Sequence, residues 1–281
     1  MKNNSDKYFP DLIGQHSVKK KLSFYLNAFK KTSQSPFLLM AGAKGLGKTE
    51  FAKAFSKNLH NEDGSKRTFL ELNCSSIKNN QAFFDQIFLP IIANQEITIL
   101  FDECHALPKD LTMAFLTIFN TESKSKKTFT WDESNFEFDF TKQTFIFATT
   151  ETDKIFPPLK DRLTSVDFEP YNEAELAEII KICTPDVSFG LGCIDSIAST
   201  IRGNARSAVK RSKEIALYCG ANESNNFSLD NFNDLCDNVG ILPLGLSNTE
   251  KQILQTLKKF GSATLTGLSA KLGLSKTALQ R

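Results

Sequence analysis

Short apolar runs divide the first part of the chain at regular intervals. Continuous apolar stretches occupy residues 37–41, 97–101 and 144–148, and a shorter one occupies 69–73. Segments with apolar residues at helical spacing separate them, over residues 18–31, 48–60, 81–92 and 107–120. Apolar strands that alternate with helices are typical of a parallel sheet with helices on both faces. We therefore expect an α/β domain over residues 1–171.

The apolar period changes to two within residues 127–141, which predicts a β-hairpin inserted into this domain. Aromatic residues take alternate positions along it: Phe129, Trp131, Phe136, Phe138 and Phe140. Five aromatic side chains on one ribbon permit two interpretations. The ribbon packs against its own domain, or it offers an apolar face that binds another protein.

From residue 172 onward the apolar period is helical. Asn172 and Glu175 have the spacing of a capping box, which predicts a helix that begins at residue 173. Further helices are expected over 194–201, 205–218 and 229–237, so that residues 172–240 form a helical lid domain. Ser247 and Glu250 open a last unit, residues 241–281, whose helices over 250–260 and 265–272 have a helix-turn-helix pattern.

The composition is that of an ordinary globular protein. Of the 281 residues, 41% are hydrophobic and 23% are charged, and the net charge of +2 indicates no particular partner. The 25 phenylalanines are expected to fill the core and the hairpin. The six cysteines lack C-x-x-C spacing and only three histidines are present, which argues against a zinc site. A signal-peptide pattern and a membrane-spanning stretch are both missing, so we expect reduced thiols, a cytoplasmic location and no membrane.

A phosphate-binding loop follows the first apolar run. The string Gly-Ala-Lys-Gly-Leu-Gly-Lys-Thr fits G-x-x-x-x-G-K-[ST] at every fixed position, between an expected strand and an expected helix. Gly42, Gly45 and Gly47 let backbone N–H groups turn toward phosphate oxygens, and the helix N-terminus adds its positive dipole end. Lys48 is expected to reach the β- and γ-phosphates of ATP, and Thr49 to hold Mg²⁺.

Polar residues end the next two buried strands. Asp102 and Glu103 follow the run over 97–101, where Asp102 can hold Mg²⁺ beside Thr49 and Glu103 can act as the general base toward the attacking water. Thr150 follows the run over 144–148 and could contact the γ-phosphate or the water.

Two arginines are further candidates, because the guanidinium group matches phosphate oxygens bidentately. Arg162 follows a loop that prolines fix, and Arg206 lies at the start of an expected lid helix. Taken alone, each arginine would be interpreted as a surface charge.

This order of motifs resembles the AAA+ ATPases, and within them the RuvB motors that drive branch migration of Holliday junctions. The matching segments are an adenine-side box at 8–15, an acidic box at 101–105, a sensor 1 at 148–150, an arginine-finger segment at 159–162 and a sensor 2 at 202–206. The resemblance implies that Ile13 lies beside the adenine, that Arg162 acts in a neighbouring subunit's site and that Arg206 contacts the nucleotide.

The same resemblance implies cofactors and partners. We expect ATP and Mg²⁺ as cofactors, a homo-oligomeric, hexameric ring, and DNA, branched or duplex, as substrate. The hairpin over 127–141 takes the place where RuvB motors engage a RuvA-like adaptor. The segment 244–246 resembles the entry to a winged-helix domain, of which the residues up to Arg281 would form a truncated version.

Two function hypotheses from different classes result. The leading one is an ATP-driven ring motor for branch migration. The alternative is an ATP-switched loader or initiator that grips DNA without translocating, as clamp loaders and origin-binding AAA+ proteins do. Clamp-loader ATPase subunits usually carry Ser-Arg-Cys at the finger, whereas this chain has Asp161, Arg162 and Leu163. A superfamily 2 helicase would need a second RecA-like domain, for which residues 172–281 are too helical and too short.

Overall fold

The computed structural model describes residues 7–93, 95–119, 127–131, 134–138 and 142–279. The chain forms two compact units, residues 1–170 and residues 171–281.

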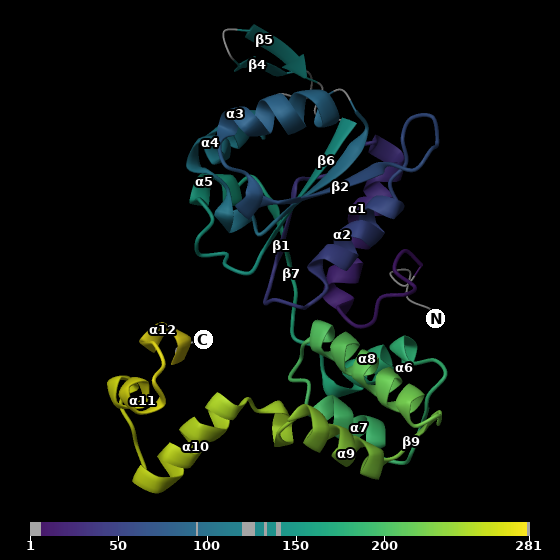
Figure 1. The fold of residues 1–281 in the computed structure, drawn as a ribbon. Coiled ribbons are helices and arrows are strands. Elements are labelled where there is room, and N and C mark those ends of the chain that lie inside the picture. Colours follow the sequence, from purple (N-terminus) through teal and green to yellow (C-terminus); the bar gives the residue numbers. More distant parts are fainter. Residues whose placement is uncertain (1–6, 94, 120–126, 132–133, 139–141, 280–281) are drawn as a thin grey trace. The chain divides into compact units, whose positions relative to one another are not determined.

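Unit 1 is built on a five-stranded parallel sheet (Figure 1). Its strands, in spatial order, are β2 (Thr68–Asn73), β3 (Ile97–Asp102), β6 (Gln143–Thr149), β1 (Leu38–Ala41) and β7 (Thr164–Asp167). Every residue of β1 and β6 is buried, as is β3 up to its last residue. The parallel sheet expected from the continuous apolar runs is thereby confirmed, and β7 adds an edge strand that the pattern did not indicate.

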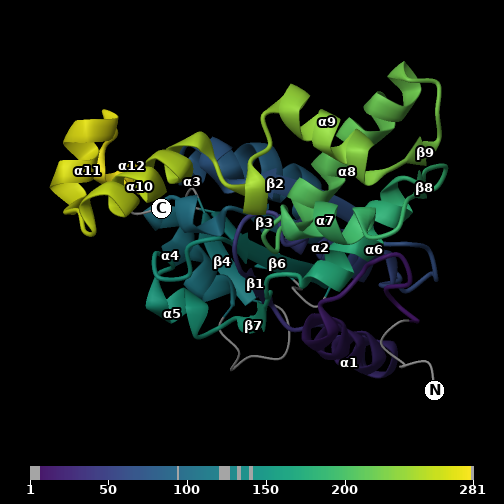
Figure 2. The same ribbon diagram turned by 90° about the horizontal axis from the view of Figure 1, so that it is seen from below.

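Helices cover both faces of this sheet. α1 (His16–Thr32) and α2 (Lys48–Lys57) lie on one face (Figure 1). The other face carries α3 (Asn80–Phe83), its π-helical continuation η2 (Phe84–Ile92) and α4 (Lys109–Ile118), with the short α5 (Pro157–Lys160) beside α4 (Figure 2). The helix expected over 81–92 is therefore mostly π-helical, and Pro90 lies inside it.

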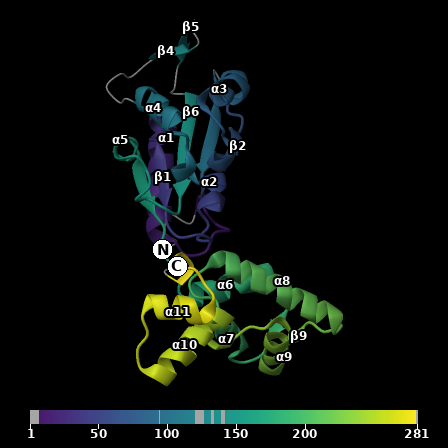
Figure 3. The same ribbon diagram turned by 60° about the vertical axis from the view of Figure 1, so that its left-hand side comes forward.

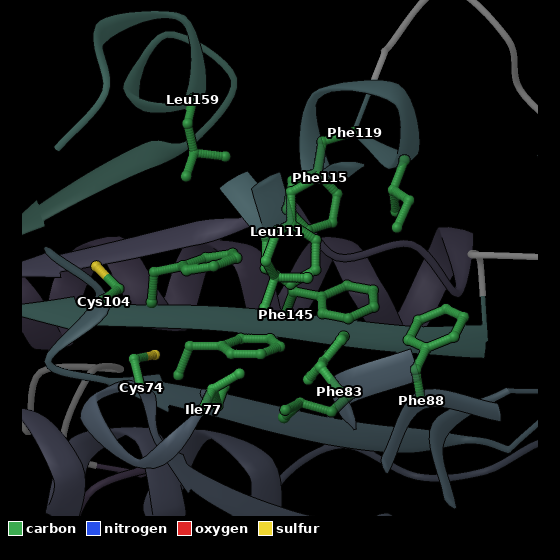
Figure 4. Packing of buried hydrophobic residues seen from close by; sticks show 14 of the residues in the cluster. Cys74, Ile77, Phe83, Phe88, Cys104, Leu111, Phe115, Phe119, Phe145 and Leu159 are labelled. Atoms are coloured by element: carbon green, nitrogen blue, oxygen red, sulfur yellow. The ribbon is translucent and has the colours of Figure 1, made fainter. Parts of the chain in front are cut away.

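Phenylalanine dominates the core between the sheet and this second set of helices (Figure 4). Phe101 of β3 stacks on Phe147 of β6, with ring centroids 4.9 Å apart and an angle of 12° between the ring planes. Phe115 of α4 meets Phe101 edge-on at 5.2 Å. Such aromatic pairs stabilise beyond the area that they bury, by about 0.5–1.5 kcal/mol each. The cluster therefore fixes β3 and β6 against each other close to their carboxyl ends.

The predicted hairpin is present. β4 (Lys127–Trp131) pairs antiparallel with β5 (Ser134–Phe138), in a register that sets position 129 opposite 136 and position 131 opposite 134. The turn residues 132–133 and the segment 139–141, which includes Phe140, lie outside the described residues. Both interpretations of the aromatic positions therefore stay predictions.

Unit 2 is helical. Its first part comprises α6 (Glu173–Cys183), α7 (Cys193–Ser199), α8 (Ala205–Ala221) and α9 (Leu229–Val239), with a small parallel pair, β8 (Ser188–Phe189) and β9 (Asn226–Phe227). Both predicted capping boxes form, Asn172 with Glu175 and Ser247 with Glu250. α10 (Asn248–Phe260), α11 (Leu265–Leu272) and α12 (Lys276–Leu279) follow, and α11 packs against α10 (Figure 3).

The start of α10 is attached to the first part of unit 2. Arg202 Nη1 lies 2.7 Å from Glu250 Oε1. Gly245, in the 3-10 turn Pro243–Gly245, has φ 64°, and a Cβ at that position would overlap the carbonyl oxygen of Thr200. The close backbone contact requires glycine. A boundary at residue 240, between a lid domain and a terminal helix-turn-helix domain, stays a proposal.

Candidate nucleotide site

The phosphate loop connects β1 to α2 and fits closely against the chain that follows β7. Gly42 has φ 153°, and a Cβ there would lie 2.9 Å from both Cβ and the carbonyl oxygen of Phe168. Its N–H donates to the carbonyl oxygen of Thr149 at 3.3 Å. Any side chain at this position would collide with Phe168 and displace the loop, which explains why the pattern begins with glycine.

Lys48 turns its ammonium group into this loop. The side chain is largely buried, and Nζ donates to the carbonyl oxygens of Gly42 at 2.8 Å and Ala43 at 2.9 Å. Thr49 follows, half-buried, in the first turn of α2. A positive charge held inside a curled backbone at a helix N-terminus suits a phosphate group. The contacts hold the Lys48 ammonium group inside the loop, and its role toward the phosphates of ATP stays a prediction.

The segment expected to border the adenine is fixed to the same edge of unit 1. Gln15 has a left-handed backbone, and its Nε2 donates to the carbonyl oxygen of Glu169 at 2.6 Å. The amide of Glu169 donates back to Gln15 Oε1 at 3.2 Å. This reciprocal pair ties the segment to the chain that covers Gly42. Ile13, half-buried within the segment, stays a proposed neighbour of the base.

The acidic pair ends β3, next to β6. Asp102 Oδ1 accepts the N–H of Glu103 at 3.0 Å. Glu103 leaves the strand in a left-handed conformation, φ 53° and ψ 46°, with its side chain 36% exposed. Thr150, just beyond β6, donates its hydroxyl to Glu103 Oε2 at 3.4 Å. The phosphate loop, the acidic pair and Thr150 therefore all follow the carboxyl ends of neighbouring parallel strands.

Oxygen ligands of this kind suit magnesium. Mg²⁺ binds few protein oxygens and keeps water and phosphate oxygens as its other ligands. The hydroxyl of Thr49 and the carboxylate of Asp102 supply that donor set at the sheet edge. Both assignments remain proposals.

Two side chains near Glu103, His105 and Glu151, were not singled out from the sequence. His105 lies within 3.0 Å of Thr149 Oγ1, within 3.5 Å of Glu103 Oε2 and within 3.6 Å of Glu151 Oε1. The sequence could have indicated them by position, because His105 follows the end of β3 and Glu151 follows the end of the neighbouring strand β6. A histidine two residues after a carboxylate has too many structural uses to be chosen on that basis alone.

Cys104, between Glu103 and His105, is not a nucleophile candidate. The side chain is buried, and burial raises its thiol pKa to about 12. Burial also raises the pKa of the neighbouring Cys74 thiol. Both thiols remain protonated near neutral pH, so the reactive groups at the carboxyl ends of these strands are carboxylates and hydroxyls.

The two candidate arginines lie in different units. In unit 1, Arg162 is half-buried, and its Nη1 donates to the carbonyl oxygen of Pro158 at 2.8 Å. In unit 2, Arg206 is exposed on the first turn of α8, whose N-cap residue Asn204 accepts the amide of Ser207. Their predicted contacts with nucleotide therefore stay proposals.

No helix within the described ranges has the length and apolar character needed to cross a membrane.

Comparison with known proteins agrees with this geometry. Residues 38–171 match the family model of the ATPase family associated with various cellular activities (AAA). The Holliday junction branch migration complex subunit RuvB of Thermotoga petrophila is 26% identical over 97% of this chain and 81% of its own length. A solved structure of a mutant Thermotoga maritima RuvB superimposes with a TM-score of 0.77 at 25% identity, covering 96% of this chain and 86% of the other. The replication factor C small subunit of Methanococcus maripaludis is 28% identical over 71% of this chain and 59% of its own length.

Proposed function

We propose that this chain, in which residues 38–171 form an AAA ATPase domain, is an ATP-driven ring motor that acts on branched DNA. One observation carries the proposal. The similarity to RuvB extends over nearly the whole chain, through the ATPase domain and the helical unit that follows it. The name of that relative assigns it to the branch migration of Holliday junctions, and we extend this activity to the present chain.

ATP would bind at the carboxyl edge of the sheet. Lys48 and the backbone amides of the loop would hold the β- and γ-phosphates, and Thr49 and Asp102 would hold Mg²⁺. The metal ion neutralises charge that develops on the phosphates. Glu103 would take a proton from the attacking water, and Thr150, which reaches the same carboxylate, would face the γ-phosphate or the water.

Arg162 would complete the site of a neighbouring subunit, and Arg206 would contact nucleotide from the lid. An arginine that supplies charge from another subunit makes hydrolysis depend on assembly. The proposed assembly is therefore a homo-oligomeric ring, with six subunits by resemblance to the RuvB motors. A RuvA-like adaptor would dock on the hairpin, and α10 to α12 would contribute to the grip on DNA.

A loader or initiator remains the alternative, because this chain is also similar to a replication factor C small subunit. The identity is 28%, the same as for the RuvB of Campylobacter fetus. The similarity to replication factor C covers a smaller share of this chain, and residues 161–163 read Asp-Arg-Leu rather than the Ser-Arg-Cys usual in clamp loaders. The motor is therefore the better supported of the two.

The deciding experiment measures ATP turnover and strand exchange on a synthetic four-way junction. A motor is expected to hydrolyse ATP faster with the junction and a RuvA-like protein, and to convert the junction into duplex products. A loader would bind DNA in an ATP-dependent way without converting it. If the junction does not accelerate ATP hydrolysis and is not converted into duplex products, with or without the adaptor, the motor proposal is wrong.

A further inference from the structure

His105 connects two segments that the proposed mechanism treats separately. It lies in the 3-10 turn Cys104–Ala106 directly after Glu103, with its side chain 17% exposed. Nδ1 is 3.0 Å from Thr149 Oγ1 and 3.5 Å from Glu103 Oε2. Nε2 is 3.6 Å from Glu151 Oε1. One imidazole ring thus contacts Glu103 and Thr149 through Nδ1 and Glu151 through Nε2.

The hydrogen bonds of Thr149 leave an acceptor site for this ring. Thr149 is fully buried, and its Oγ1 accepts the N–H of Glu151 at 2.9 Å. A hydroxyl oxygen has two lone pairs, so Oγ1 can also accept a proton from His105 Nδ1. A proton on Nδ1 lies between Thr149 Oγ1 and Glu103 Oε2, and Nε2 faces the Glu151 carboxylate. That carboxylate also pairs with Lys154, so it has a partner on each side.

Glu103 Oε2 lies between groups from both strand ends. Thr150 donates its hydroxyl to this oxygen at 3.4 Å, and His105 Nδ1 approaches it at 3.5 Å. Thr150 is also the residue that would meet the γ-phosphate or the water. A movement of the loop after β6 would therefore reach Glu103 directly through Thr150 and indirectly through Thr149 and the imidazole.

We propose that His105 is a positioning residue that couples the orientation of Glu103 to the end of β6, Thr149, and to the loop that continues with Thr150 and Glu151. It holds Glu103 in the hydrolytic orientation when that loop is in place, and it does not itself take the proton. The inference rests on the proposed role of Glu103 as general base.

The surroundings of His105 allow this role to be separated from packing. His105 lines a cavity of about 370 Å³ together with Thr112, Ile155 and Phe156. A shortened side chain at position 105 would open onto space that already exists, so the fold should tolerate the change. Core substitutions are costly chiefly where they create a new cavity in a filled region.

The first test uses three substitutions of His105 and one control substitution in the full chain, with ATP turnover measured at saturating Mg²⁺. His105→Ala is expected to lower kcat by about 10- to 100-fold and to leave KM for ATP within about twofold, because small misplacements of a reacting group have effects of that order. His105→Asn keeps a donor near Nδ1 and should recover much of kcat. His105→Gln keeps a donor near Nε2 and should recover less. His60→Ala, at an exposed histidine in unit 1, is the matched control and should leave turnover unchanged.

The second test asks whether His105 and Glu151 act together. Glu151→Gln keeps the shape and removes the charge, and its effect on kcat should shrink or vanish when His105 is already alanine. Independent effects that simply multiply would contradict the coupling. A fall in kcat that accompanies a large fall in melting temperature, without recovery in His105→Asn, would make His105 a packing residue and overturn the inference.

The variant Glu103→Gln separates failure of this inference from failure of the proposed function. If Glu103→Gln keeps near-native turnover, the assignment of the base is wrong and the role of His105 is wrong with it. If Glu103→Gln is inactive while His105→Ala has normal kcat, only the inference about His105 is wrong.

Discussion

The backbone conformation of Glu103 determines where its side chain points. A left-handed conformation is uncommon for a residue with a side chain, and it recurs at functional sites, where the surroundings compensate for its cost. Here the N–H of Glu103 is held by Asp102 Oδ1. The carboxylate proposed to hold Mg²⁺ therefore also stabilises the turn that carries the proposed base. A change at Asp102 should disturb both functions together.

Glu103→Gln gives the sharpest prediction at the scale of a residue. The amide keeps the shape of the side chain and loses both the charge and the capacity to accept a proton, so ATP turnover should fall by about 10²- to 10⁴-fold. Nucleotide binding, measured by equilibrium titration, should persist. Lys48→Ala is the contrasting variant, because it should lose nucleotide binding itself. Undiminished ATP affinity in Lys48→Ala would contradict the assignment of the phosphate loop.

Elements with a strong local signal were predictable, and those held by distant contacts were not. β1, β3 and β6 read as continuous apolar runs, because both of their faces are buried. β7 is an edge strand with two half-buried residues and one exposed one, and it is fixed by pairing with β1 rather than by its own pattern. β8 and β9 contain two residues each, which is too short for any period to show.

The start of α10 has a measurable pH signature. The pKa of Glu250 is about 2, below its ordinary value of 4.5, because the backbone N–H of Ser247 donates to its carboxylate and Arg202 then adds a charged donor. The folded state favours the carboxylate, so this capping contribution is present above pH 4.5 and is lost as the pH falls toward 2. A titration of Glu250 by NMR should give a midpoint near 2. Arg202→Ala should raise that midpoint, and an unchanged midpoint would exclude the ion pair as a cause.

The hairpin supports a prediction about an adaptor. Two-stranded ribbons are marginally stable alone, so some of its aromatic residues must pack on unit 1 or on another chain. We expect Trp131, at the turn end of β4, to be an anchor for the adaptor. Trp131→Ala should then weaken binding to a RuvA-like protein by roughly 30-fold, or about 2 kcal/mol. Basal ATP turnover and melting temperature should stay nearly unchanged, and a sharp fall in melting temperature would instead support packing on unit 1.

At the scale of the whole chain, the site depends on contacts that no local pattern shows. Gln15 and Glu169 are 154 positions apart, yet their reciprocal hydrogen bonds fix the segment that is proposed to border the adenine. His105 and Thr149 meet because β3 and β6 are neighbours in the sheet, although 44 positions separate them. The motifs could therefore be predicted from the sequence, whereas the link between the acidic pair and the loop after β6 required the structure.

The proposed ring leads to a prediction that can be tested only by mixing two kinds of subunit. If Arg162 serves the site of the neighbouring subunit, Arg162→Ala and Glu103→Gln subunits are each inactive alone, for different reasons. In rings assembled from equal amounts of both, about a quarter of the interfaces would pair an intact Glu103 with an intact Arg162 from the next subunit, by random assembly of a cyclic oligomer. ATP turnover should therefore return in part on mixing. Light scattering or native mass spectrometry must first establish that mixed rings form, because mixed rings without restored turnover would show that Arg162 does not act between subunits.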